Sequence, residues 1–115
     1  MALDEEMLNL AGVIISRKKN KEVVRLLYEK HKETLNLKDE KEREAGRKLY
    51  FNQIFRELKG SRSSLAGALD ELVIYKIVQN MVASIPEGLV RFYSLTYDGK
   101  ILELIETMYE NEMLN

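Results

Sequence analysis

The sequence predicts a mainly α-helical domain with one small β-hairpin, in the order helix, helix, short strand, helix, helix, strand, strand, helix. Apolar residues recur every three or four positions through most of the chain, which is the spacing of one helix face. Branched and aromatic residues instead dominate two runs between residues 77 and 96, separated by a turn cluster as in a hairpin. With 115 residues, of which 45% are hydrophobic, the chain has the size and apolar content of a single domain over residues 1–115.

The composition excludes several classes of protein. Cysteine is absent, which excludes disulfide bonds and thiolate metal sites. The chain shows no signal peptide and no long apolar run, so we expect a cytoplasmic protein without a membrane partner. The net charge of −1 argues against a protein that coats nucleic acid through bulk positive charge, so any contact with DNA must be local.

Two helices are expected over about residues 3–35. In the first, the apolar positions at helical spacing are Leu3, Met7, Leu10, Ala11 and Ile14. Residues 16–21 (SRKKNK) form a polar break, and Asn20 is placed to cap the second helix. The expected buried stripe of that helix consists of Val23, Val24, Leu27 and Tyr28.

Residues 36–48 are expected to form an exposed connection. The segment NLKDEKEREAGR has almost no apolar residue except Leu37 and Ala45, so it is either a solvated helical extension or a mobile linker. We favour an exposed, partly helical connection.

A helix-turn-helix is expected over about residues 52–75. Residues 49–51 fit a very short strand, and Asn52 is placed to cap the helix that follows. Gly60 can adopt positive φ where this helix ends. Ser61 or Ser63 then caps a second helix, whose buried face is expected to be Leu65, Leu69 and Leu72.

The hairpin, or wing, is expected over about residues 77–96, with a turn at residues 84–88 (SIPEG). Alternation in its second strand places Val90, Phe92 and Ser94 on one side and Leu89, Arg91, Tyr93 and Leu95 on the other. We expect Arg91 to project from the side that faces away from the core. Thr96 or Asp98 is then placed to cap a C-terminal helix over about residues 98–113.

This order of elements is that of a winged helix-turn-helix. The run from Leu49 resembles the winged-helix transcriptional regulators of bacteria and archaea, in the broad sense that covers the MarR-like, PadR-like, HxlR-like and ArsR-like groups. The matching segments are LYFNQIFRELKG, SRSSLAGALDEL, KIV and VRFYSLTYDGKILELIE, and LNLAGVIISRKKNKEVVRLLYEKH matches more weakly. Two positions depart from the pattern: Lys76 stands where these families often have glycine, and Glu87 stands at the wing tip where they offer Arg or Lys. The wing is therefore expected to be a poor reader of DNA.

The resemblance implies that the second helix of the helix-turn-helix enters the DNA major groove. The residues expected to meet base edges are Arg62, Ser63, Ser64, Gly67 and Ala68. The residues expected to meet phosphates are Arg47, Lys48, Arg56, Lys59 and Arg91. Between residues 47 and 65 five basic residues face only Glu57, which favours a local positive surface. The alternative is a solvated surface whose charges cluster without a partner.

The C-terminal helix carries an apolar stripe broader than one contact surface requires. We expect a second copy of the chain to cover part of this stripe, which would make the protein a homodimer. The residues expected in that interface are Ile101, Leu104, Ile105, Met108 and Tyr109.

No enzyme chemistry, cofactor or metal site is predicted. His31 is the only histidine and lies in a polar stretch, so we expect a surface residue. Gly-rich phosphate loops and His-rich metal spacings are missing, and the acids of residues 39–44 lack the turn glycine of a calcium loop. Several Met and Tyr side chains could line a pocket for a small-molecule effector, although filling a core and a dimer interface explains them more simply.

These expectations combine into a homodimeric, sequence-specific, double-stranded DNA-binding transcriptional regulator. The alternative is a winged-helix adaptor that binds protein rather than DNA, which the near-neutral charge and the acidic wing favour. A third possibility is a small-molecule sensor whose contact with DNA is regulated by its ligand.

Overall fold

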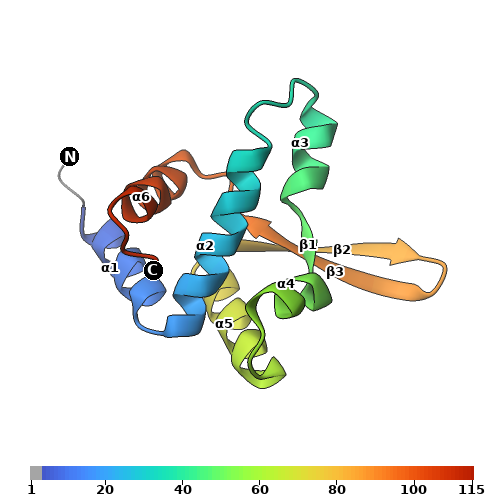
Figure 1. The fold of residues 1–115 in the computed structure, drawn as a ribbon, viewed down its shortest axis with the longest axis horizontal. Helices are drawn as coiled ribbons and strands as arrows, with labels where there is room; N and C mark the ends of the chain where they lie inside the picture. The colour runs from blue at the N-terminus through green and yellow to red at the C-terminus, as the bar shows by residue number, and fades with distance from the viewer. Residues whose placement is uncertain (1–3) are drawn as a thin grey trace.

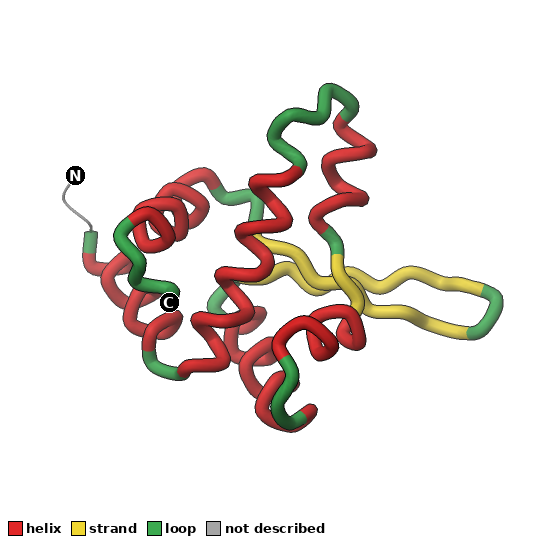
Figure 2. Tube along the Cα trace, viewed as in Figure 1, coloured by secondary structure: helices red, strands yellow, loops and turns green. Residues whose placement is uncertain are grey.

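Helices and one three-stranded antiparallel sheet make up the protein in a computed structural model, which describes residues 4–115 (Figures 1 and 2). The elements in chain order are α1 (Glu5–Ile15), α2 (Lys18–Glu33), α3 (Glu40–Arg47), β1 (Leu49–Tyr50), α4 (Phe51–Leu58), α5 (Arg62–Ile74), β2 (Val78–Ile85), β3 (Gly88–Leu95) and α6 (Gly99–Glu110). The predicted mainly helical chain with a hairpin is confirmed, with α3 as one helix more than the predicted order contained. The expected start at residue 3 lies outside the described residues. Within residues 4–115, no helix combines the length and the apolar character needed to cross a membrane.

Helix α2 lies at the centre of the molecule. Figure 1 shows α1 and α6 on one side of it, and α4, α5 and the sheet on the other. The predicted stripe of α2 is buried at Val23, Val24, Leu27 and Tyr28, and the predicted face of α5 is buried at Leu65, Leu69 and Leu72. Burying one large apolar side chain contributes about 1.5–3 kcal/mol, so these two faces are major contributors to the stability of the fold.

The break between the first two helices is shorter than predicted. Helix α1 ends at Ile15 and α2 begins at Lys18, so Asn20 lies inside α2. Arg17 occupies the N-terminal cap of α2 and makes no side-chain capping bond. The prediction that Asn20 caps this helix is wrong, because its side chain is fully buried and bonds to other elements instead.

The segment 36–48 contains the short helix α3, which packs beside α2 (Figure 1). Asp39 caps α3 by accepting a hydrogen bond from the backbone N–H of Lys41 at 3.1 Å. No residue of α3 is buried. The segment is thus exposed and partly helical, as favoured from its composition.

Thr34 joins the end of α2 to α3. Its buried hydroxyl donates to the carbonyl of His31 at 2.7 Å and accepts from Nε of Arg47 at 2.7 Å. Gly46 lies so close to it that a Cβ at this position would be 2.7 Å from Cγ2 of Thr34. Because its two hydrogen bonds and its β-branched side chain hold Thr34 in place, only glycine fits here without a shift.

Strand β1 pairs with β3 and leads directly into α4. The N-terminal cap of α4 is Tyr50, whose backbone N–H donates to the side chain of Gln53 at 2.8 Å. The prediction that Asn52 caps this helix is therefore wrong. The helix begins earlier than expected because the last residue of β1 is itself the cap.

Two consecutive residues in the left-handed region make the turn between α4 and α5. The φ angle is 59° at Lys59 and 85° at Gly60, so the prediction for Gly60 is confirmed and Lys59 also has positive φ. Ser61, one of the two predicted caps, accepts a hydrogen bond from the backbone N–H of Ser64 at 3.0 Å. The chain therefore reverses within three residues and starts α5 at Arg62.

Strands β2 and β3 form a long hairpin that projects beyond the helices (Figure 2). The sheet order is β1-β3-β2, which leaves β2 at an edge. The turn consists only of Pro86 and Glu87, because Ile85 already pairs with Gly88. The expected turn at residues 84–88 was therefore too long.

Arg91 is exposed on β3. Alternation groups it with Tyr93 and Leu95, which are both buried, but Ser94 of the other set is 0% exposed as well. The expected division into one core side and one outer side is therefore wrong at the base of β3, which is covered on both sides. Arg91 is exposed because the hairpin has passed most of the helical body at this point.

Helix α6 is covered by its own chain. Asp98, one of the two predicted caps, accepts hydrogen bonds from the first backbone N–H groups of α6. The stripe that was expected to form a dimer interface packs against α1 and α2 and is buried at Ile101, Leu104, Ile105 and Met108. Tyr109 lies against Tyr28, with ring centroids 5.0 Å apart. The inference that a second copy must cover this stripe is therefore wrong.

Replacing Gly46 by alanine is expected to destabilise the protein, because the new methyl group would overlap Cγ2 of Thr34. Overpacking costs about 1–3 kcal/mol, and the better helix propensity of alanine offsets up to about 1 kcal/mol of it. Gly12→Ala is the matched control, since a Cβ there meets nothing within 4 Å and only the propensity gain remains. Chemical denaturation measures both variants. A Gly46→Ala protein as stable as Gly12→Ala would contradict the close packing of α3 on α2.

His31 is half-buried rather than on the surface, and its pKa is lowered from 6.5, first by burial and then by the charge of Arg47. The fold thus favours the neutral imidazole. The contribution of the neutral His31 side chain to stability is complete above the ordinary pKa of histidine. It is lost as the pH falls through about 6.5 toward the lower pKa of the folded state. His31→Gln should remove this loss, measured as the free energy of unfolding on either side of that pH. Equal losses in the two proteins would assign the pH dependence to other groups.

Candidate nucleic-acid interface

Three cations gather where α4 ends and α5 begins. Arg56 lies in the last turn of α4, Lys59 in the connecting turn and Arg62 at the first position of α5. Together with Asn52, Phe55 and Gly60, they line an open cavity of about 550 Å³. The cations meet because the left-handed turn brings the start of α5 back beside α4.

The guanidinium of Arg62 is held over α4. Its Cζ lies 4.5 Å from the ring centroid of Phe55 and 5.9 Å from that of Phe51. Its Nη1 donates to Oδ1 of Asn52 at 3.0 Å. A cation over an aromatic face gains about 0.5–1 kcal/mol at an exposed site. Arg62 is therefore oriented by α4 rather than extended from the start of α5.

These cations form no ion pair within residues 4–115. The neighbouring Lys19 pairs with Glu22 at 3.0 Å, and its Nζ also donates to the carbonyl of Lys59 at 3.3 Å. The surface around the turn is thus positive although the net charge of the chain is −1. Such a patch attracts anions over about one Debye length, roughly 8 Å at physiological ionic strength.

A second cavity continues this surface along α4 to the hairpin. It measures about 620 Å³ and shares Asn52 and Arg56 with the first cavity. Arg91 of β3 lines it from the hairpin. We call the strip made by Asn52, Arg56, Lys59, Arg62 and Arg91 the basic surface.

The other residues predicted to meet base edges lie in different surroundings. Ser63 and Ser64 are exposed in the first turn of α5, next to the basic surface. Gly67 is half-buried, and a Cβ there would be 3.8 Å from Nη1 of Arg17. Ala68 is 0% exposed because it lies on the same face of α5 as the three buried leucines. The prediction that Ala68 meets base edges is wrong.

Two of the predicted phosphate contacts lie away from the basic surface. Arg47 is bonded to Thr34 and shares a cavity with acids of α3. Lys48 lines a cavity with Lys41, Glu44 and Phe92, near the start of β1. The structure therefore brings together Arg56, Lys59, Arg62 and Arg91 but not the two cations of residues 47–48.

The outward face of α5 contains two residues that the sequence reasoning missed. Asp70 is exposed, and Ile74 is 73% exposed. Helical spacing from Ser63 through Gly67 would have found both, since these positions follow at intervals of four, three and four. An acid in the middle of this face repels phosphate, so the N-terminal turn of α5 is its most favourable part for an anionic ligand.

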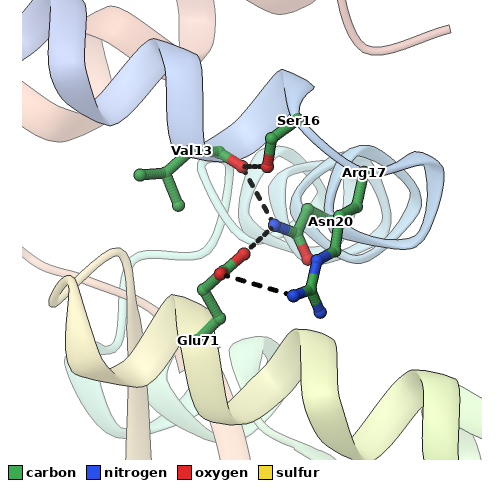
Figure 3. A network of polar contacts seen from close by, with 5 residues as sticks. All are labelled: Val13, Ser16, Arg17, Asn20 and Glu71. Carbon is green, nitrogen blue, oxygen red and sulfur yellow. Dashed lines mark hydrogen bonds and ion pairs between the residues drawn. The ribbon is translucent and has the colours of Figure 1, made fainter.

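A buried polar network fixes α5 against the turn between α1 and α2 (Figure 3). Nδ2 of Asn20 donates to the carbonyl of Val13 at 2.9 Å and to Oε1 of Glu71 at 2.7 Å. Arg17 approaches the other carboxylate oxygen at 3.8 Å. Glu71 of α5 therefore points toward α1 and α2. Oδ1 of Asn20 is buried and has no hydrogen-bond partner among the described residues.

The basic surface can bind an anion through guanidinium, ammonium and amide groups. Within the described chain, no group of three or more His, Cys, Asp or Glu side chains could hold a metal ion. No protein-family model, curated protein or solved structure matches the chain. The chemistry of the basic surface is therefore the basis for assigning a function.

Replacing Asn20 by aspartate should be strongly destabilising, because a carboxylate oxygen would replace the amide that faces the Val13 carbonyl and the Glu71 carboxylate. An uncompensated buried charge costs about 3–5 kcal/mol. Arg17→Gln is the contrasting variant, since a long, exposed ion pair contributes about 0–1 kcal/mol. Urea denaturation compares the two. Equal, small losses would show that the buried amide does not hold α5 in place.

Proposed function

We propose that this chain is a winged helix-turn-helix protein that binds double-stranded DNA through the basic surface. The element order and the sheet order β1-β3-β2 support this, because α4, the turn and α5 stand directly before a hairpin that pairs with a short strand preceding α4. In this arrangement α5 is the helix that enters the major groove.

The observation that carries the proposal is the cluster around the start of α5 of three cations that form no ion pair with any residue from 4 to 115. Phosphate neutralisation by Lys and Arg supplies most of the affinity of DNA-binding proteins. Ser63 and Ser64 stand beside this cluster at the end of α5 that meets base edges in helix-turn-helix complexes. Affinity and sequence reading would then come from adjacent parts of one surface.

The proposed roles follow from how each side chain is held. Arg56 and Lys59 contact phosphates on one side of the groove, and Arg91 extends the phosphate contact along the hairpin. The guanidinium of Arg62 is held over the ring of Phe55 and must leave that ring to reach a guanine, so its resting position favours a phosphate. Glu87 at the hairpin tip is repelled by phosphate, so α5 rather than the tip reads the sequence.

Arg56→Gln and Lys59→Gln should each weaken binding to every duplex alike. Each variant removes about one phosphate contact, which should flatten the slope of log K against log salt by about 0.9. Lys100→Gln, which makes the same charge change on α6 across the molecule from α4, is the matched control and should leave the slope unchanged (Figure 1). Mobility-shift or anisotropy titrations at several salt concentrations measure the slopes.

Two results would contradict this assignment. Slopes that flatten equally in Lys100→Gln would show an effect of net charge rather than of the basic surface. Absence of binding by the wild-type protein at low salt would favour the second candidate, a winged-helix adaptor that binds protein. The observation that favours an adaptor is the apolar hairpin, where Val82, Ile85 and Leu89 are exposed.

A further inference from the structure

Strand β2 is an open edge of the sheet. Among residues 4–115 it pairs with β3 on one side only, so every second residue of β2 turns its backbone N–H and C=O away from the sheet. Proteins usually protect such an edge with charged residues, proline or a bulge, because unpaired strand groups bind other strands. Residues 78–85 (VQNMVASI) contain no charge and no proline, and they pair with β3 residue by residue without a bulge.

The hairpin also exposes more apolar surface than a solvated hairpin requires. Val82 is 57% exposed on one side of β2, and Leu89 of β3, on the same side, is 77% exposed. On the other side Met81 pairs with Phe92, whose ring lies 4.5 Å from that of Tyr50. The outer hairpin projects away from the helices (Figure 1), and Val82 and Leu89 are among its exposed apolar side chains, whereas Met81 and Phe92 are half-buried.

The charges that flank this edge have opposite signs. Lys76 precedes β2 and Glu87 follows it, both are exposed, and neither forms an ion pair within residues 4–115. Two copies of β2 side by side in parallel would place like charges together at both ends. An antiparallel pair instead places Lys76 of each copy near Glu87 of the other. The edge is therefore electrostatically complementary to itself in one orientation only.

We propose that β2 pairs with β2 of a second copy in antiparallel orientation, across a two-fold axis at Met81. In this register Asn80 lies opposite Val82 of the second copy and Val78 lies opposite its Ser84. The two sheets then form one continuous six-stranded sheet, and the outward N–H and C=O groups of both edges are paired. The interface is isologous, so it closes as a dimer instead of growing into a fibre. This inference goes beyond the proposed DNA binding and does not depend on it.

The oligomeric state tests the proposal. In light scattering or sedimentation, the wild-type chain should approach twice its monomer mass of 13.4 kDa as the concentration rises. Val82→Lys places a charge next to the two-fold axis and should raise the dimer dissociation constant by at least about tenfold. Leu8→Lys makes the same change at a residue of α1 that is 56% exposed, against 57% for Val82, and should leave the dimer intact.

A charge exchange tests the orientation. Lys76→Glu and Glu87→Lys should each weaken the dimer, because each places like charges together, and the double variant should restore it. Circular dichroism checks that every variant is folded. A wild-type protein that stays monomeric up to its solubility limit, equal dissociation by Val82→Lys and Leu8→Lys, or a double variant weaker than both single variants would each overturn the proposal.

A DNA measurement separates this proposal from the proposed function. Val82 lies opposite Arg91 of the basic surface, so this measurement uses Val82→Pro, which removes an outward N–H of β2 without adding a charge. This variant should still bind a duplex that offers a single site, since the cations of the basic surface are unchanged. If this variant is monomeric and binds the duplex with the affinity of the wild type, the edge pairing is supported and DNA binding does not require it. If the wild-type protein dimerises through β2 but binds no duplex, only the proposed function fails.

Discussion

The contact between α2 and α5 is the one on which the rest of the structure depends. Val23, Val24 and Leu27 from α2 and the three leucines of α5 are all withdrawn from water. The outer layers, α1 and α6 on one side and α4 with the sheet on the other, attach to this pair of helices. The hydrogen bond between Asn20 and Glu71 fixes the relative position of α2 and α5, because hydrogen bonds are directional and apolar burial is not.

Sequence periodicity predicted which residues are buried, but not what covers them. The spacing of Leu65, Leu69 and Leu72 was sufficient to predict their burial, because residues at these intervals lie on the same face of a helix. The stripe of α6 was equally visible, yet its cover came from α1 and α2, two helices far away in sequence, and not from a second copy. The surroundings of polar and small residues were harder to predict than those of large apolar residues. Asn20 has the chemistry of a cap and of a buried amide, and only the position where α2 begins decides between them. Ala68 is small enough to suit either face of α5. Its burial depends on the rotation of that helix.

The basic surface shows how a nearly neutral chain can present a strong local charge. The acids and bases are separated along the sequence, and the reversal at Lys59 and Gly60 then brings three bases together in space. Of the four arginines and lysines of this surface, Arg62 alone is held by side-chain contacts with the described residues, namely an aromatic ring and an amide oxygen. The others keep their side-chain freedom and lose it only when they bind, which lowers affinity but allows them to adapt to the shape of a ligand.

The packing of α1 on α6 has a kinetic consequence. These helices lie side by side but are separated by roughly 90 residues of chain, so their contact requires the closure of a very long loop. The elements from β1 to β3 are near neighbours in sequence and can assemble with much shorter loops. Folding should therefore begin in the middle of the chain and finish where its two ends meet, and amide hydrogens in α1 and α6 should exchange with solvent earlier than those of the central helices.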